Sequence, residues 1–149
     1  MSKLYAAYGS NLNVAQMGFR CPTAKPIAKS WLFDYALVFQ GAPYGAHANV
    51  VPRKGYDVPV VIWDISAADE RALDRYEGVA GGYYTKEYIP VECGGEIKEV
   101  LIYIMSPNPY GIPSDSYLDT IAKGYEDFNL PTKVLNDAVI HSKEALYAS

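Results

Sequence analysis

The first half of the chain alternates short apolar stretches with Gly, Pro and polar residues, a pattern that predicts β-strands. Residues 3–8 are aromatic and apolar and run directly into Gly9-Ser10-Asn11, which is typical of a strand that ends in a tight turn. Pro52 is expected to close one of the later strands. The remaining strands of this half are predicted over 31–39, which reads as buried on both faces, 46–51 and 58–64.

Helical spacing appears first at residues 66–77. Ser66 and Asp69 fit the S-x-x-D capping box of a helix N-terminus, and Gly78 stands where a left-handed residue would end the helix. The expected apolar stripe consists of Ala72, Leu73 and Tyr76.

The second half predicts a hairpin and two helices. Strands are expected over 83–91 and 98–105, joined by a turn at Gly94-Gly95. One helix is predicted from Ser114 to about Phe128, and the last from Pro131 through Ala145. Because strands and helices do not alternate regularly, we expect one α+β domain over residues 1–149: a small mixed, mostly antiparallel β-barrel with helices packed on it.

The composition limits the partners and the kinds of reaction expected of the protein. The 149 residues carry 13 Lys and Arg against 17 Asp and Glu, a net charge of −4, which argues against nucleic acid as a partner. The chain has two His and two Cys without metal-binding spacing, so we expect buried thiols, no metal and no cofactor. No apolar run reaches the ~20 residues that span a bilayer, and no signal-peptide core is evident, so we expect a cytoplasmic location without membrane contact.

With no metal, cofactor or reactive thiol expected, two features of the chain could take part in catalysis or ligand binding. The turn at 8–12 (YGSNL) predicts a nest of backbone N–H groups, with Gly9 at positive φ, that suits a carboxylate or an oxyanion; an ordinary strand-ending turn is the alternative. Glu77 ends the helix at the negative end of its dipole, where burial would raise the pKa and make it a general base, although a solvated Glu is also common there.

The 14 tyrosines offer apolar walls with single hydroxyl groups, and three or four of them are expected to touch a ligand. Together these residues resemble the γ-glutamylcyclotransferase family. The resemblance rests on Y-G-S-N-L at 8–12, on Glu77-Gly78 followed by Gly82-Tyr83-Tyr84, and on P-S-x-x-Y at 113–117.

The resemblance implies a reaction in which the α-amine of a γ-glutamyl group attacks its own γ-amide, releasing 5-oxoproline and an amino acid or small amine. It implies that Glu77 is the catalytic base. The implied substrate-binding residues are Tyr5, Ala6, Ala7, Tyr8, Gly9, Ser10, Asn11, Tyr84 and Tyr117. The partner is then a small γ-glutamyl molecule, and the protein is a monomer or homodimer. The alternative is a non-catalytic small-molecule binding protein on the same fold.

Overall fold

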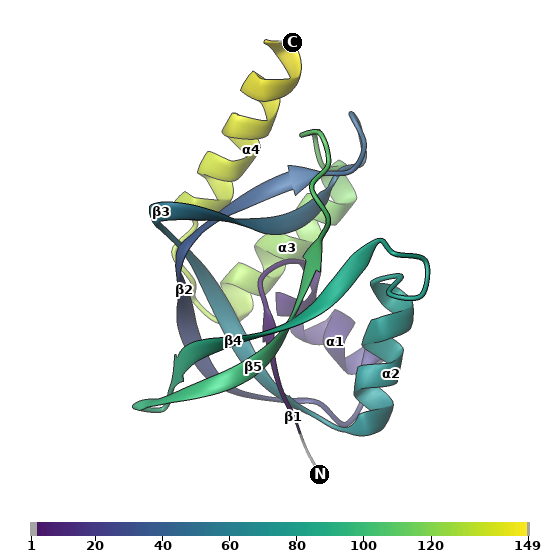
Figure 1. Cartoon of the computed structure of the whole chain (residues 1–149), viewed down its shortest axis with the longest axis vertical. Helices are drawn as coiled ribbons and strands as arrows, with labels where there is room; N and C mark the ends of the chain where they lie inside the picture. The colour runs from purple at the N-terminus through teal and green to yellow at the C-terminus, as the bar shows by residue number, and fades with distance from the viewer. Residues whose placement is uncertain (1–2, 149) are drawn as a thin grey trace.

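The computed structural model describes residues 3–148 and consists of a curled sheet with helices around it (Figure 1). In chain order the elements are β1 (Lys3–Ala7), a one-turn 3-10 helix η1 (Ser10–Leu12), α1 (Val14–Arg20), β2 (Lys25–Gln40), β3 (His47–Ile65), α2 (Ala67–Tyr76), β4 (Tyr84–Cys93), β5 (Glu96–Met105), α3 (Asp115–Asp127) and α4 (Lys133–Tyr147).

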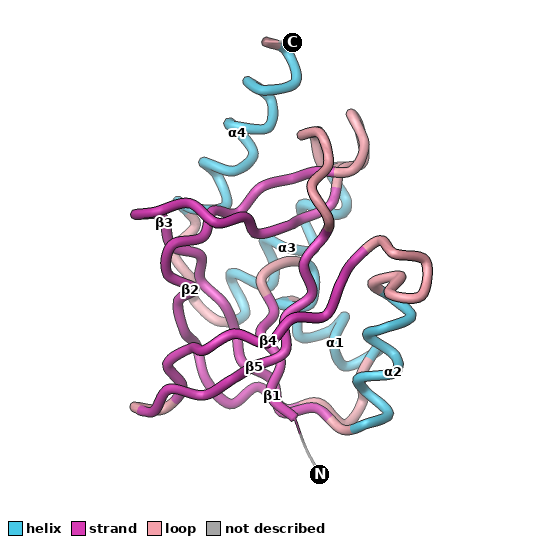
Figure 2. The backbone as a smooth tube through the Cα atoms, in the orientation of Figure 1, coloured by secondary structure: helices cyan, strands magenta, loops and turns pink. Residues whose placement is uncertain are grey.

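The five strands form one sheet in the order β2-β3-β1-β5-β4 (Figure 2). All neighbours are antiparallel except β1 and β5, which confirms the mixed, mostly antiparallel α+β fold. Over the described residues the edge strands β2 and β4 do not pair through their backbones, so the expected barrel stays open. They still meet at one point, where the hydroxyl of Ser30 donates to the carbonyl oxygen of Glu92 over 2.6 Å.

The β2–β3 hairpin is longer than the sequence predicted. The expected strands 46–51 and 58–64 are parts of one strand, and Pro52 does not end it. An irregularity in the register, where Asp34 takes a φ of 64°, absorbs the extra residues, and the Asp34 carboxylate accepts a hydrogen bond from the backbone N–H of Gly55 over 3.0 Å.

The burial expected for 31–39 is correct only for its second half. Trp31 and Phe33 are exposed, whereas Val38 and Phe39 are fully buried. Leu32, between Trp31 and Phe33, is buried, so the first half of this stretch turns one face to solvent and the other to the core.

Helix α2 begins and ends as predicted. Ser66 caps it by accepting from the backbone N–H of Asp69, whose carboxylate accepts from the N–H of Ser66, each over 3.1 Å. Gly78 has a φ of 62° and follows Glu77, the last residue of the helical turn. The apolar stripe is narrower than expected, because Leu73 is buried but Tyr76 is 54% exposed.

Of the two remaining predicted helices, α3 begins as expected and α4 is shifted toward the C-terminus. Ser114 caps α3 as expected, by accepting from the N–H of Tyr117. The last helix begins at Lys133, two residues after Pro131, and extends past Ala145 to Tyr147. In Figure 1, α4 carries the C-terminus away from the end of the molecule where the N-terminus lies.

The sequence analysis missed η1 and α1, which follow β1 and lie against α3. Asn13 caps α1 by accepting from the N–H of Gln16 over 2.9 Å, and its amide nitrogen donates to the carbonyl of Thr120 in α3 over 3.1 Å. Gly124 allows the close approach, because a Cβ there would lie 2.6 Å from the carbonyl carbon of Leu12.

The interior is formed by the strands together with buried faces of the helices. Trp63 of β3 packs edge-on against Phe128 at the end of α3, with ring centroids 5.9 Å apart. Cys21 and Cys93 are both free and buried, which confirms the expectation of buried thiols. No helix between residues 3 and 148 combines the length and apolarity needed to cross a membrane.

Candidate active site

A cavity of about 670 Å³ opens where the end of β1, the turn after it and the end of α2 meet. Its volume falls within the range of ~300–1,000 Å³ common for small-molecule sites. The residues that line it are Tyr5, Tyr8, Gly9, Ser10, Asn11, Arg20, Gly41, His47, Ala48, Arg75, Tyr76, Glu77, Gly78, Tyr83, Tyr84, Tyr103, Met105 and Tyr117.

Glu77 brings a carboxyl group to the cavity wall. The capped end of α2 fixes its position, since its backbone N–H donates to the carbonyl oxygen of Leu73 over 2.8 Å. Burial raises the pKa of Glu77 to about 7, while the positive charge of Arg20 acts in the opposite direction. Among the described residues its side chain has no hydrogen-bond or ion-pair partner, so a carboxyl group that exchanges its proton near neutral pH faces the cavity.

Two tyrosines form hydrogen bonds with the backbone of Ala48 in β3, one as the donor and the other as the acceptor. Tyr84 donates its hydroxyl hydrogen to the carbonyl oxygen of Ala48 over 2.8 Å. Tyr117 instead accepts from the N–H of Ala48 over 3.0 Å. The Tyr84 proton is therefore committed to the protein, whereas the Tyr117 proton is available to a ligand.

Like that of Tyr117, the hydroxyl of Tyr5 is an acceptor, because its oxygen accepts from the amide nitrogen of Asn11 over 3.0 Å. Its own proton is therefore also available to a ligand. The Asn11 side-chain oxygen in turn accepts from the guanidinium of Arg20 over 2.6 Å. Asn11 thus joins two cavity residues, and both ends of its side chain are occupied by protein. Tyr8 donates to the carbonyl of Tyr103 over 2.6 Å, which also commits its proton.

The turn at Gly9 forms differently from the prediction. Gly9 has a φ of −121°, so the expected positive φ is wrong. The glycine is required by space, because a Cβ there would lie 3.2 Å from the Cβ of Ala48 and 3.6 Å from the hydroxyl of Tyr117. Over the described chain, the backbone N–H groups of Gly9, Ser10 and Asn11 have no hydrogen-bond partner.

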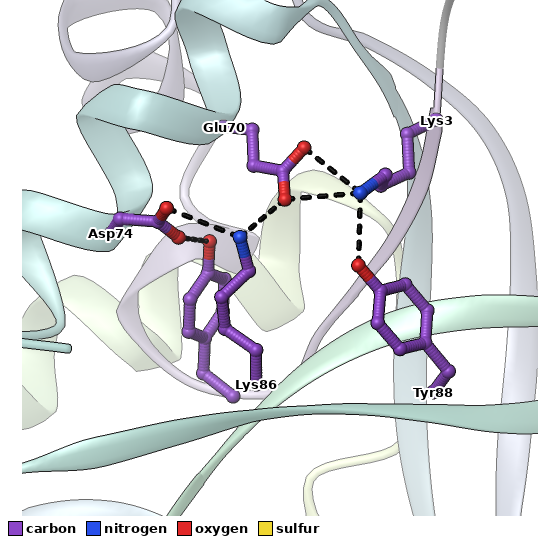
Figure 3. Close-up of polar contacts among 6 residues, drawn as sticks. Lys3, Glu70, Asp74, Lys86 and Tyr88 are labelled. Atoms are coloured by element: carbon purple, nitrogen blue, oxygen red, sulfur yellow. Dashed lines mark hydrogen bonds and ion pairs between the residues drawn. The ribbon is translucent and has the colours of Figure 1, made fainter.

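Helix α2 is held against the sheet by a polar network on the side that Figure 3 shows. Lys86 of β4 bonds to both Glu70 and Asp74 of α2, the latter over 3.1 Å, and Lys3 of β1 lies 3.0 Å from Glu70. Asp74 also accepts the hydroxyl of Tyr103 over 2.7 Å. The network ties the last turn before Glu77 to a cavity residue, which fixes the carboxyl group relative to the tyrosines.

Eight of the ten residues predicted for the site line the cavity: Glu77, Tyr5, Tyr8, Gly9, Ser10, Asn11, Tyr84 and Tyr117. Ala6 and Ala7 do not, because both are fully buried in the hydrophobic core. Tyr5 and Tyr8 on either side of them do line it, so a contact of Ala6 or Ala7 with a ligand stays a prediction.

The sequence analysis missed Arg20, which follows from missing α1, and it overlooked the cavity positions of Arg75 and Tyr76. Both precede Glu77 directly, and that adjacency was a usable signal. His47 also lines the cavity, edge-on to the ring of Tyr117 with ring centroids 5.1 Å apart. Across residues 3–148, no group of three or more His, Cys, Asp and Glu is arranged to hold a metal ion.

The chain is similar to known proteins in both sequence and structure. The AIG2-like family matches residues 57–137, which include Glu77 and Tyr117. γ-Glutamylcyclotransferase of Homo sapiens is 32% identical over 139 residues, or 87% of this chain and 73% of that protein. The Mus musculus γ-glutamylcyclotransferase is 32% identical over 137 residues, or 86% and 72%. A solved γ-glutamyl cyclotransferase has a TM-score of 0.84 at 27% identity, covering 93% of this chain and 86% of its own.

Proposed function

Because the chain belongs to the AIG2-like, γ-glutamylcyclotransferase-like family, we propose that it is an enzyme that cyclises γ-glutamyl amides. The α-amine of the γ-glutamyl group attacks the carbonyl carbon of its own γ-amide. The products are 5-oxoproline and the amino acid or small amine that formed the other half of the amide. No water is consumed, because the attacking and leaving groups are both nitrogen atoms.

The observation that carries this proposal is Glu77, a carboxyl group with a pKa of about 7 in a cavity of small-molecule size. The substrate amine is mostly protonated at neutral pH, so the reaction needs a base that is itself partly ionised there. The ammonium first loses one proton to solvent, and Glu77 takes a second proton from the free amine as its nitrogen bonds to the carbonyl carbon. It then returns a proton to the leaving nitrogen as the original C–N bond breaks.

The tetrahedral intermediate carries a negative oxygen that requires donors. The backbone N–H groups of Gly9, Ser10 and Asn11 and the uncommitted hydroxyls of Tyr5 and Tyr117 are the groups that supply them. A five-membered ring closes readily once the glutamyl chain is folded, so holding the substrate in that shape supplies much of the rate enhancement. Carboxyl, hydroxyl and amide groups suffice for every step, and the proposal includes no cofactor.

The test is release of 5-oxoproline from a panel of γ-glutamyl amino acids and γ-glutamyl amines. We expect turnover of at least one member, with stoichiometric release of the amine. Binding of several members without any 5-oxoproline, measured by calorimetry, would instead identify a non-catalytic binding protein on this fold. We propose a cytoplasmic location and a monomer or homodimer, which fractionation and light scattering would check.

A further inference from the structure

Arg20 is the one cavity cation that the protein holds in a fixed orientation. One of its terminal nitrogens, Nη1, donates to the side-chain oxygen of Asn11 over 2.6 Å and contacts the hydroxyl of Ser10 at 3.4 Å. Its guanidinium carbon lies 3.4 Å from the centroid of the Tyr76 ring. The second cavity arginine, Arg75, is exposed and has no such contacts within the described part of the chain.

Within the described chain, the guanidinium of Arg20 has nitrogen atoms without a hydrogen-bond partner. Its Nε is buried without a hydrogen-bond partner, and no group among residues 3–148 accepts from its other terminal nitrogen, Nη2. A buried polar nitrogen without a partner is costly, and the guanidinium geometry suits the two oxygens of a carboxylate. The cavity is where such an oxyacid would approach, because Arg20 lines it.

Arg20 and Glu77 face the same cavity but do not form an ion pair with each other. The positive charge of Arg20 nevertheless acts to lower the pKa of Glu77. A cation and a carboxyl group held apart in this way match a ligand that carries an ammonium and a carboxylate on one carbon atom. The α-carbon of a γ-glutamyl group carries this pair.

We propose that Arg20 is a substrate-binding residue that holds the α-carboxylate of the γ-glutamyl group, and so directs the neighbouring α-amine to Glu77. This assignment rests on the proposed function and sharpens its substrate class. The enzyme requires a free α-carboxylate, whereas the amine that leaves is not selected by Arg20.

The test compares two substrates in three main proteins and in two further variants, Arg71→Met and Arg75→Met. The first substrate is a γ-glutamyl amine with a free α-carboxylate, and the second is the same molecule with that carboxylate converted to a primary amide. The proteins are the wild type, Arg20→Met and Arg20→Lys. Arg71→Met is the matched control, because Arg71 is an exposed arginine on α2 that does not line the cavity.

For the carboxylate substrate we expect Arg20→Met to lower kcat/KM by about 10²–10³-fold, mainly through KM, as for loss of a charged hydrogen-bonded pair. For the α-amide substrate the kcat/KM of the same variant should stay within about threefold of the wild-type value, because this substrate has no carboxylate for the guanidinium to bind. On the carboxylate substrate, the kcat/KM of Arg20→Lys should lie between those of the wild type and Arg20→Met. Lysine keeps the positive charge but lacks the planar guanidinium group.

Equal losses on both substrates would overturn the assignment, because they would mean that Arg20 acts only by supporting Ser10 and Asn11. A larger carboxylate-specific loss from Arg75→Met would also overturn it. Failure of the wild type to release 5-oxoproline from the carboxylate substrate is a different result, because it overturns the proposed function and the assignment resting on it. Normal wild-type turnover with an unchanged substrate preference in Arg20→Met overturns the Arg20 assignment alone.

Discussion

Tyr117 accepts a hydrogen bond from the backbone N–H of Ala48 over 3.0 Å, and this leaves its own proton free to be donated into the cavity. Tyr84 makes the reverse contact with the same residue, donating to its carbonyl over 2.8 Å. Two phenols that appear equivalent in the sequence therefore have different capacities toward a ligand. The difference arises because one hydroxyl meets the N–H of Ala48 and the other meets its carbonyl oxygen.

The two tyrosines should respond differently to loss of the hydroxyl. We expect Tyr117→Phe to lower kcat/KM for 5-oxoproline release by about 10²-fold, the scale for removing one donor to a developing oxyanion. Tyr84→Phe should show a smaller kinetic loss and a decrease of about 1 kcal/mol in the free energy of unfolding, because it loses a hydrogen bond within the protein. Steady-state kinetics and urea unfolding on both variants check this. Equal kinetic losses would contradict the distinction.

Glu77→Gln should keep the fold and bind substrate, but lose turnover by about 10²–10⁴-fold. In the wild type, the profile of kcat/KM against pH should rise through an apparent pKa near 7, because only the ionised carboxylate accepts the proton. A stopped assay for 5-oxoproline between pH 5 and 9 measures both effects. Near-native turnover in the variant, or an acidic limb at the ordinary pKa of glutamate, would reject Glu77 as the base.

The same raised pKa links stability to pH. The folded protein binds the Glu77 proton with a pKa of about 7, above the ordinary glutamate value of 4.5, so this group favours folding below pH 4.5 and loses that contribution as pH rises through 7. At pH 8 we therefore expect Glu77→Gln to be more stable than the wild type, by on the order of 2 kcal/mol. The gap should close at pH 4. Urea titrations at the two pH values measure it, and a gap independent of pH would contradict the buried ionisation.

Local signals in the sequence were sufficient for α2 and insufficient for the elements around it. Ser66, Asp69 and Gly78 act within one helix, so their pattern could be read without tertiary information. The seven residues of α1 form too short a helix to show a repeating apolar stripe, so Arg20 was not placed in the site. The burial that raises the pKa of Glu77 comes from residues distant in sequence, and no local pattern encodes it.

Gly9 should be intolerant of a side chain. We expect Gly9→Val to lower kcat/KM by at least about 10²-fold, because a branched side chain would collide with the Cβ of Ala48 at 3.2 Å and displace the hydroxyl of Tyr117. Gly18→Ala is the control, since a Cβ at Gly18 meets nothing within 4 Å. A folded Gly9→Val protein with unchanged KM and kcat would show that the turn is only structural.

Gly124 should control stability rather than chemistry. A Cβ at this position would lie 2.6 Å from the Leu12 backbone, so Gly124→Ala is expected to reduce the free energy of unfolding by about 1–3 kcal/mol. In Gly18→Ala the added methyl lies on the exposed part of α1, and a gain of about 0.5–1 kcal/mol is expected. Urea midpoints rank the three proteins. A Gly124→Ala protein as stable as the wild type would mean that α3 can move away from η1 at no cost.

The first strand of the chain is the central strand of the sheet. β1 pairs with β3 on one side and with β5 on the other, so it joins two hairpins that have no other paired strand between them in the described fold. During synthesis the N-terminal segment must wait for residue 65 before its first neighbour is complete, and for residue 105 before its second. The cavity wall at Gly9–Asn11 continues directly from β1, so a nascent chain can complete this wall against the sheet only after residue 105 has been synthesised.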